Sequence, residues 1–329
     1  MRFGKFNKRA GIIKTAVLMS TVLLLSACAQ PGLKEAEGTA VPETNSSEET
    51  ESLYHENEFG FVDESMDVSG GIPENAEGRL FIIRERGYLT VATEPYYSPQ
   101  EFIDPSLEGE EQYVGADMEL ARLIAERMGV ELRIVPLDFS DALASVANGT
   151  NDLIISGVSF TPARAGILEM SKGYHFTDET ANVGILIREE DRDRIRSEED
   201  LAGKNLAAQS GSVQESLLAE HVMNYRQFRR FNNMSEIYTA LEKGEVDAAA
   251  ADIETASIYI SNNPGCGLTF IEGIGYSLEE QYWGDRIAGP KDELMLMYFV
   301  NGVIDEVVKD GTYEAWFDEY TDYAARLGV

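Results

Sequence analysis

The order of the predicted elements constrains the fold most, because both halves of the chain contain the same succession strand-helix-strand-helix-strand. Short apolar runs predict the strands, and amphipathic segments ended by glycine predict the helices. The first half has predicted strands at Tyr88–Thr93, Glu131–Pro136 and Asp152–Ser156, with helices at Val114–Gly129 and Ser140–Asn148. The second half has strands at Asn205–Gln209, Phe228–Asn232 and Asp247–Ala251, with helices between them. This alternation predicts parallel sheets with right-handed crossovers.

The stretch DLIISGVSFTPAR, residues 152–164, joins a predicted buried strand to the start of a helix. Gly157 is predicted to end the strand, and Thr161-Pro162 suits a helix N-cap followed by proline at the first helical position. Arg164 then lies beyond the carboxyl end of a strand, where open α/β sheets bind ligands. Polar groups expected beside it are the hydroxyls of Ser156 and Ser159 and a free N–H at Gly157. Together they suit a carboxylate, although a surface arginine at a helix start explains the same residues.

Residues 1–27 have the features of an export signal. Five basic residues accompany the apolar run Ala16–Leu25, which is too short to span a bilayer comfortably. The run ends in Leu25-Ser26-Ala27-Cys28, which resembles the lipobox of bacterial lipoproteins. The resemblance implies that Cys28 is acylated and becomes the first mature residue, so that the protein is extracytoplasmic and held to the cell membrane by its lipid. An uncleaved anchor helix is the alternative.

Residues 28–71 are predicted to form an acidic disordered tether. They are rich in Glu, Ser, Thr and Gly and lack apolar periodicity, although residues 53–68 carry aromatic side chains that suit local docking. The formal net charge of the whole chain is −31. Removing residues 1–27, which hold five positive charges and no acidic residue, makes it −36. Such a surface repels nucleic acid, and it also keeps an exported protein soluble.

The cysteines and histidines indicate neither a disulfide framework nor a metal site. With Cys28 acylated, Cys266 has no intramolecular partner, so an apolar core must hold the fold. His55, His175 and His221 are scattered without ligand spacing. We therefore expect no metal and no cofactor.

From about Leu89 to the C-terminus the chain resembles the family 3 extracellular solute-binding proteins, which bind amino acids for ABC importers. Six segments carry the resemblance in the family's order: YLTVATEPYYSPQEF, YVGADMELARLIAERMGV, NDLIISGVSFTPAR, LAGKNLAAQSGS, ALEKGEVDAAAAD and DGTYEAWFDEY. The implied partners are a free amino acid and ABC permease subunits, and the implied state is a monomer.

The fold implied by this resemblance is α/β, with two lobes that are each a mostly parallel sheet flanked by helices. Two hinge strands join the lobes, which close on the ligand like a flytrap. Lobe 1 would comprise residues 72–180 and 284–329, and lobe 2 residues 181–283.

Binding roles are likewise implied by the resemblance. Arg164 would clamp the ligand's α-carboxylate, assisted by Ser159 and the Gly157 N–H, and Asp252 would receive the α-ammonium group. Ser156 would contact the amino group or its surroundings. Backbone N–H groups of Ser212 and Val213, at a helix N-terminus, would reach the carboxylate. Tyr97 and Phe139 would sandwich the ligand, with Gln209 and Gln214 near the far wall.

Three departures from the family pattern affect the pocket. Val213 stands where Ser or Thr is frequent, and Gln100 stands where an aromatic residue is frequent. The segment QYWGDRIAGP differs from the family's usual return strand at the second hinge.

The side-chain end of the pocket is expected to be bounded by Glu94, Asp117, Tyr97, Phe139, Gln100, Gln209 and Gln214. Acidic residues at the positions of Glu94 and Asp117 face cationic ligand ends in some relatives. An anionic side chain would meet Glu94 without a counter-charge, which is costly in a buried site. A polar or cationic amino acid is therefore favoured over an acidic or branched aliphatic one.

Two other functions remain open. A dehydratase-like enzyme on this fold would need a general acid or base in the cleft, for which Glu94, Asp117 and Asp252 are candidates. A ligand-sensing domain would usually continue into a transmembrane helix. We expect a non-enzymatic binding protein.

Overall fold

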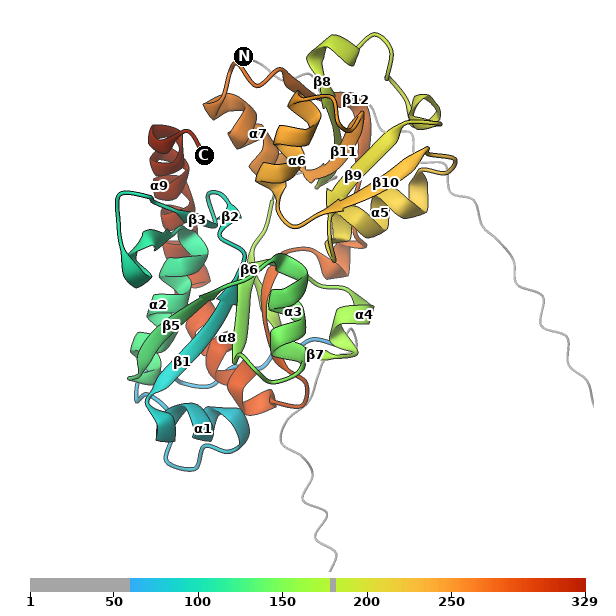
Figure 1. The fold of residues 1–329 in the computed structure, drawn as a ribbon. Coiled ribbons are helices and arrows are strands. Elements are labelled where there is room, and N and C mark those ends of the chain that lie inside the picture. The colour runs from blue at the N-terminus through green and yellow to red at the C-terminus, as the bar shows by residue number, and fades with distance from the viewer. Residues whose placement is uncertain (1–59, 178–181) are drawn as a thin grey trace, which may run out of the picture. The chain divides into compact units, whose positions relative to one another are not determined.

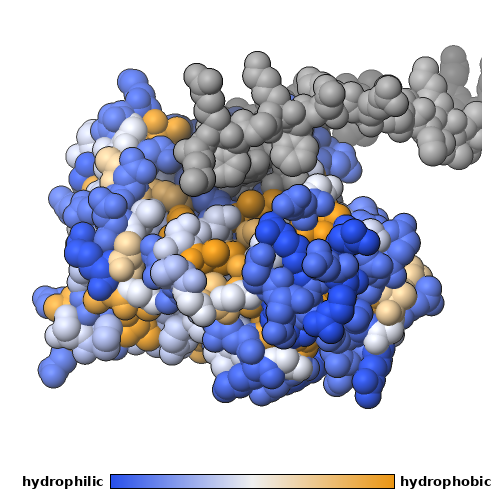
Figure 2. Space-filling model, turned by 90° about the horizontal axis from the view of Figure 1, so that it is seen from above, coloured by the Kyte–Doolittle hydropathy of each residue, from blue (hydrophilic) through white to orange (hydrophobic). Residues whose placement is uncertain are grey.

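The structure is a computed structural model that describes residues 60–177 and 182–329. The export signal, the lipobox at Cys28 and the tether up to residue 59 lie outside the described residues. Within them, no helix is both long and apolar enough to cross a membrane. On the face seen in Figure 2, the described surface is mostly hydrophilic, with hydrophobic residues in small separate patches.

The first sheet has the strand order β5-β1-β6-β13-β7 (Figure 1). Its strands are β1 (Tyr88–Thr93), β5 (Glu131–Pro136), β6 (Leu153–Ser159), β7 (Leu168–His175) and β13 (Asp285–Pro290). β1 pairs in parallel with β5 and β6, whereas β13 runs antiparallel between β6 and β7. A segment from near the end of the chain thus completes a sheet begun by residues 88–175.

Helices cover both faces of this sheet. They are α1 (Gly78–Arg86), α2 (Ala116–Met128), α3 (Phe139–Ala147), α4 (Pro162–Ala165), α8 (Leu294–Lys309) and α9 (Thr312–Leu327). Leu153 and Ile155 of β6 pack into the core shared with α1, α2, α8 and α9, while Ile154 packs into the core beneath α3. Side chains alternate across a strand, so burial on both sides explains the continuous apolar run that marks β6.

The second sheet has the order β10-β9-β11-β8-β12. Its strands are β8 (Val183–Arg188), β9 (Asn205–Gln209), β10 (Gln227–Phe231), β11 (Ala248–Asp252) and β12 (Leu268–Tyr276), and its helices are α5 (Val213–His221), α6 (Met234–Glu242) and α7 (Ile253–Asn262). β9, β10 and β11 are parallel, and β8 is antiparallel to β11 and β12. We call each sheet with its helices a lobe, the first and the second.

Smaller elements complete the described chain. A three-stranded sheet consists of β2 (Tyr96–Tyr97), β3 (Glu101–Ile103) and β4 (Tyr113–Val114). Short 3₁₀ helices lie at η1 (Gly109–Gln112), η2 (Glu189–Asp191), η3 (Glu198–Leu201) and η4 (Glu280–Tyr282).

The predicted fold class, two lobes with mostly parallel sheets flanked by helices, is confirmed. The sequence patterns missed α1, α7, β7 and the three-stranded sheet. One boundary differs for a clear reason: β6 continues past Gly157 to Ser159, because Gly157 adopts φ 51° within the strand and bends it without ending it. The predicted lobe boundaries at residues 72, 180 and 283 remain predictions.

Residues 60–71 differ from the predicted tether, because they pack against the first lobe. Val62 is fully buried, and its N–H donates to the Met170 carbonyl at 2.8 Å. Asn301 on α8 donates from Nδ2 to the carbonyls of Val62 and Glu64, each at 2.8 Å. Gly302 permits this approach, since a Cβ there would lie 2.3 Å from the Met66 carbonyl oxygen. The predicted docking of part of this segment is therefore confirmed for these residues.

Candidate functional site

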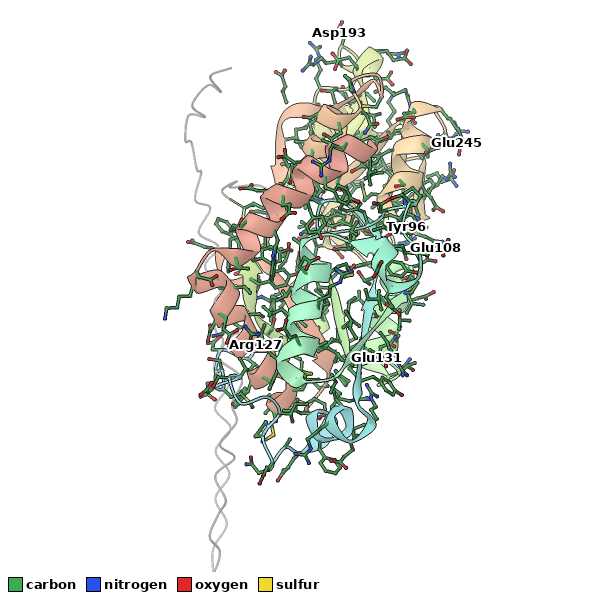
Figure 3. The ribbon with its side chains drawn as sticks, turned by 90° about the vertical axis from the view of Figure 1, so that its left-hand side faces the viewer. Tyr96, Glu108, Arg127, Glu131, Asp193 and Glu245 are labelled. Carbon is green, nitrogen blue, oxygen red and sulfur yellow. The ribbon has the colours of Figure 1, made fainter. Side chains whose placement is uncertain are left out.

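Strand ends from both sheets meet at one pocket. Glu94 follows β1, Ser159 and His175 end β6 and β7, and Asp285 begins the antiparallel β13, so all four lie at one edge of the first sheet. In Figure 3, Tyr96 beyond β1 and Glu131 at the start of β5 lie at opposite ends of that sheet, and the pocket is at the Tyr96 end. Gln209 and Asp252 end β9 and β11 of the second sheet. The carboxyl ends of parallel strands are where open α/β sheets bind ligands.

The pocket is lined by residues of both lobes. Twelve of the thirteen predicted ligand-binding residues line it: Glu94, Tyr97, Phe139, Ser156, Gly157, Ser159, Arg164, Gln209, Ser212, Val213, Gln214 and Asp252. Other lining residues include Gln100, Glu101, His175, Asn182, Glu254, Thr255, Tyr282, Trp283 and Asp285. The ligand-binding roles of these residues remain predictions.

Arg164 is held in place from both lobes. The Thr161 hydroxyl accepts the Arg164 N–H at 3.1 Å, which is the predicted N-cap of α4. The guanidinium donates to the Ser159 carbonyl at 2.6 Å and to the Gly211 carbonyl of the second lobe at 2.9 Å. Burial lowers the pKa of Arg164 to about 10, and within the described chain no carboxylate forms a salt bridge with it. The planar donors of such a guanidinium suit the two oxygens of a carboxylate.

The second lobe contributes two helix N-termini. Asp252 caps α7, and its Oδ1 accepts the Thr255 N–H at 2.9 Å. Burial raises the pKa of Asp252 to about 6. Ser212 caps α5, but its own N–H points to the Gln209 carbonyl at 3.3 Å. The Val213 N–H is therefore better placed than that of Ser212 to serve an anion at this helix terminus.

Hydrogen-bond acceptors accumulate at the end of β1. Glu94 is 2% exposed, and its Oε2 accepts from Gln209 Nε2 of the second lobe at 3.3 Å. The Ser156 hydroxyl accepts the Glu94 N–H and donates to Glu101 at 2.7 Å. Three buried acceptors have no hydrogen-bond partner in the described chain: Glu94 Oε1, Gln100 Oε1 and Glu101 Oε2. Burial raises the pKa of Glu94 to about 8. Unpartnered buried acceptors are costly, so this region calls for a ligand that donates several hydrogen bonds.

Asp117 does not line the pocket, contrary to the sequence prediction. It is fully buried beneath it, where Oδ2 accepts the Gly157 N–H at 3.0 Å and the Tyr174 hydroxyl at 2.9 Å. Oδ1 accepts the Tyr313 hydroxyl at 2.6 Å. The Gly157 N–H, expected to be free for the ligand, is therefore already used. Local sequence placed Asp117 at a helix start near the sheet edge but gave no indication that its side chain points into the core.

His175 joins three elements beside the pocket. Its Nε2 lies 3.1 Å from Glu254 on α7, and its Nδ1 lies 3.2 Å from Glu314 on α9. The ring stacks on Phe317 with centroids 4.4 Å apart. Burial by itself lowers the pKa of His175, but the hydrogen bonds to the two glutamates raise it to about 10. The imidazolium is thus a cationic contact between the lobes.

Tyr97 and Phe139 both line the pocket, and their predicted role of sandwiching the ligand remains a prediction. The Phe139 ring centroid is 5.3 Å from the Arg164 guanidinium carbon, so the ring supports the cation. Tyr97 packs on the core of the second lobe around α6 and also lines the pocket.

Sequence reasoning missed the charged residues Glu101, His175, Glu254 and Asp285 in this pocket. The sequence indicates two of them. Glu254 follows the predicted ligand residue Asp252 by two positions, and Asp285 lies in the segment QYWGDRIAGP, which departs from the family pattern.

Comparison with known proteins agrees with this geometry. Residues 89–323 match the family described as bacterial extracellular solute-binding proteins, family 3. The chain is 26% identical over 238 residues to a probable histidine-binding protein of Campylobacter jejuni, covering 70% of this chain and 84% of the relative. A solved structure of an amino acid ABC transporter substrate-binding protein of Streptococcus pneumoniae, bound to L-arginine, is 30% identical with a TM-score of 0.65, covering 74% of this chain and 98% of that one. An ancestral amino acid-binding protein that is a precursor of cyclohexadienyl dehydratase is 26% identical with a TM-score of 0.63, covering 74% of this chain and 100% of that one.

Asp117→Asn should destabilise the fold, because the amide group of asparagine would face hydroxyl and N–H donors. We expect the free energy of unfolding to fall by about 1–3 kcal/mol, measured by urea denaturation with an unchanged m-value. Asp141→Asn, on the exposed side of α3, makes the same charge change and is the control. Equal midpoints for the two variants would contradict the buried-acceptor role.

Glu94→Gln should change how stability depends on pH. The folded-state pKa of Glu94 is raised from 4.5 to about 8, so its contribution to stability is fully present below pH 4.5 and is lost as the pH rises toward 8. Without ligand, the variant should therefore exceed the wild type in free energy of unfolding at pH 8 by about 1–3 kcal/mol and differ little at pH 4. Parallel curves of the free energy of unfolding from pH 4 to 8 would contradict the raised pKa of the buried Glu94 carboxyl group.

Proposed function

Because the chain belongs to the family 3 bacterial extracellular solute-binding proteins, we propose that it captures a cationic or polar amino acid between its lobes and delivers it to an ABC importer. Among the family's ligands, arginine, lysine, histidine and glutamine are favoured over glutamate, aspartate and branched aliphatic amino acids. The protein works as a lipid-anchored receptor outside the cytoplasm, held at Cys28.

The charge balance of the pocket carries this proposal. Its described lining holds five carboxyl groups, which belong to Glu94, Glu101, Asp252, Glu254 and Asp285. The cationic groups of that lining are Arg164 and His175, and His175 is already bound to two glutamates. A zwitterion brings one carboxylate for Arg164 and one ammonium group for the acids. A further positive or donor-rich side chain would satisfy the unpartnered acceptors of Glu94 and Glu101, whereas an acidic side chain would add a second ligand carboxylate to the five carboxyl groups of the lining.

The contacts between the lobes support capture by closure. Gln209 with Glu94, Arg164 with Gly211, and His175 with Glu254 each join the two lobes around the pocket. A ligand that binds groups of both lobes favours the closed arrangement by its differential affinity.

A dehydratase is the second candidate, favoured by the raised pKa of Glu94, which would suit a general acid. The related ancestral binding protein is a precursor of such an enzyme. Incubation with prephenate separates the two: a binding protein yields no product over the uncatalysed rate, and enzyme-dependent decarboxylation and dehydration would overturn the proposal.

Calorimetry with the twenty amino acids tests both the ligand class and the binding roles of Arg164 and Asp252. Arg164→Ala should weaken binding by at least about 30-fold, since removing one partner of a buried charge pair costs about 2–5 kcal/mol. Asp252→Ser removes the charge but keeps an N-cap for α7, so a similar loss reports the charge and not the helix. Arg133→Ala, at an exposed arginine outside the pocket, should bind as the wild type does. Preferred binding of glutamate or leucine would refute the proposal of a cationic or polar ligand.

Cys28→Ser should release the protein from the membrane fraction without changing amino acid affinity. The lipid supplies the anchor, so its loss leaves the lobes intact. Fractionation after a high-salt wash, with immunodetection in pellet and supernatant, gives the result. Retention of the variant in the pellet would argue against a lipid anchor at this residue.

A further inference from the structure

β13 brings a carboxylate into the pocket from the hinge region. Asp285 is its first residue, and it pairs with Ser159 of β6 on one side and His175 of β7 on the other. Its half-buried side chain lines the pocket. The next residue, Arg286, turns into the first lobe and donates to the Ser171 carbonyl at 2.9 Å. Asp285 is thus the β13 residue that lines the pocket.

Gln100 fixes the orientation of this carboxylate. Its Nε2 donates to Asp285 Oδ2 at 2.7 Å, and the side chain is 2% exposed. The amide nitrogen must face the carboxylate, because a flipped amide would place oxygen against oxygen. Gln100 Oε1 therefore points elsewhere, and it has no partner among the described residues. Gly157 makes room for this arrangement: a Cβ there would lie 3.0 Å from the Tyr97 ring and 3.5 Å from Gln100 Nε2.

Asp285 lies at the end of the pocket that holds the carboxylate clamp. Its strand partner Ser159 supplies the carbonyl that binds Arg164 at 2.6 Å. A zwitterion places its ammonium group a few ångströms from its carboxylate, so an anion beside this clamp is suited to the ammonium group. Glu94 follows β1, which lies on the opposite side of β6 from β13 in the first sheet.

Charges of both signs act on Asp285. The cations are His175 on β7, Arg164 on α4 and Arg286, the next residue of β13. The acids are Asp117 on α2, Asp252 at the end of β11 and Glu254 on α7. Burial raises the pKa of Asp285 to about 7, against the opposing effect of His175. A bound cation would favour the ionised carboxylate, so ligand binding near neutral pH would expel a proton from this residue.

We propose that Asp285, oriented by Gln100, is a ligand-binding residue that holds the α-ammonium group of the bound amino acid together with Asp252, with one carboxylate from each lobe. This assignment rests on the proposed function and adds a ligand-binding residue to the same site. Two carboxylates and the Gln100 carbonyl oxygen satisfy the three N–H donors of a primary ammonium group. The site therefore requires an unblocked primary α-amine, whatever the ligand's side chain is.

Calorimetry of Asp285→Asn in buffers of different ionisation enthalpy tests this. Loss of a charged hydrogen bond predicts about 10- to 100-fold weaker binding of every amino acid that the wild type binds. Proton release at pH 7 should also fall by up to about half a proton, since Asp285 titrates near that pH. Asp141→Asn is the charge-matched control and should leave both quantities unchanged.

Gln100→Met is a second variant that leaves the Asp285 carboxylate in place. It removes a donor to the ionised form, so the pH at which affinity is half-maximal should rise. Unchanged affinity and proton release in Asp285→Asn, or weakening confined to cationic ligands, would overturn the proposal. Failure of the wild type to bind any amino acid would instead refute the proposed function, and equal binding of N-acetylated and free amino acids would refute the ammonium site alone.

Discussion

The carboxylate of Asp117 is the contact on which the pocket floor depends. It lies on α2 and accepts hydrogen bonds from β6, β7 and α9, through Gly157, Tyr174 and Tyr313. These elements come from residues separated by up to 196 positions in the chain. The bond to Gly157 also holds the strand at the positive φ that leaves space for Tyr97 and Gln100 above it. Asp117, whose two oxygens both accept hydrogen bonds, thus supports the part of the pocket that the other acidic residues line.

Three side chains above that floor lack hydrogen-bond partners instead. Glu94, Glu101 and Gln100 each keep one buried acceptor atom without a partner in the described chain. Folding normally pairs such atoms, so a cluster of unpaired ones is a cost that the protein bears for another purpose. On the proposed function, a bound donor-rich cation would remove that cost and complete the hydrogen-bond network. Stability without ligand and affinity for it are opposed at these positions.

Local patterns predicted the parts of the site that are formed by local structure. The Thr161-Pro162 signal placed Arg164 correctly, because an N-cap and the helix it begins are adjacent in sequence. Asp285 was missed because its position depends on β13 pairing with β6, whose residue Ser159 lies 126 positions earlier. Residues 60–71 were assigned to the tether for the same reason: their polar composition suggests disorder, while their packing depends on Asn301 and Gly302 far along the chain. Long-range pairing, and not propensity, decides these cases.

The pairing of β13 on both sides has a kinetic consequence. Because β13 lies between β6 and β7, Asp285 and Arg164 both belong to the first lobe. Asp252 and the α5 N-terminus belong to the second lobe. On the proposed roles of these residues, the first lobe alone would hold both ends of a zwitterion and would set how often an encounter is productive. Closure of the second lobe would then set how long the captured molecule stays, so the two lobes would divide association from residence time.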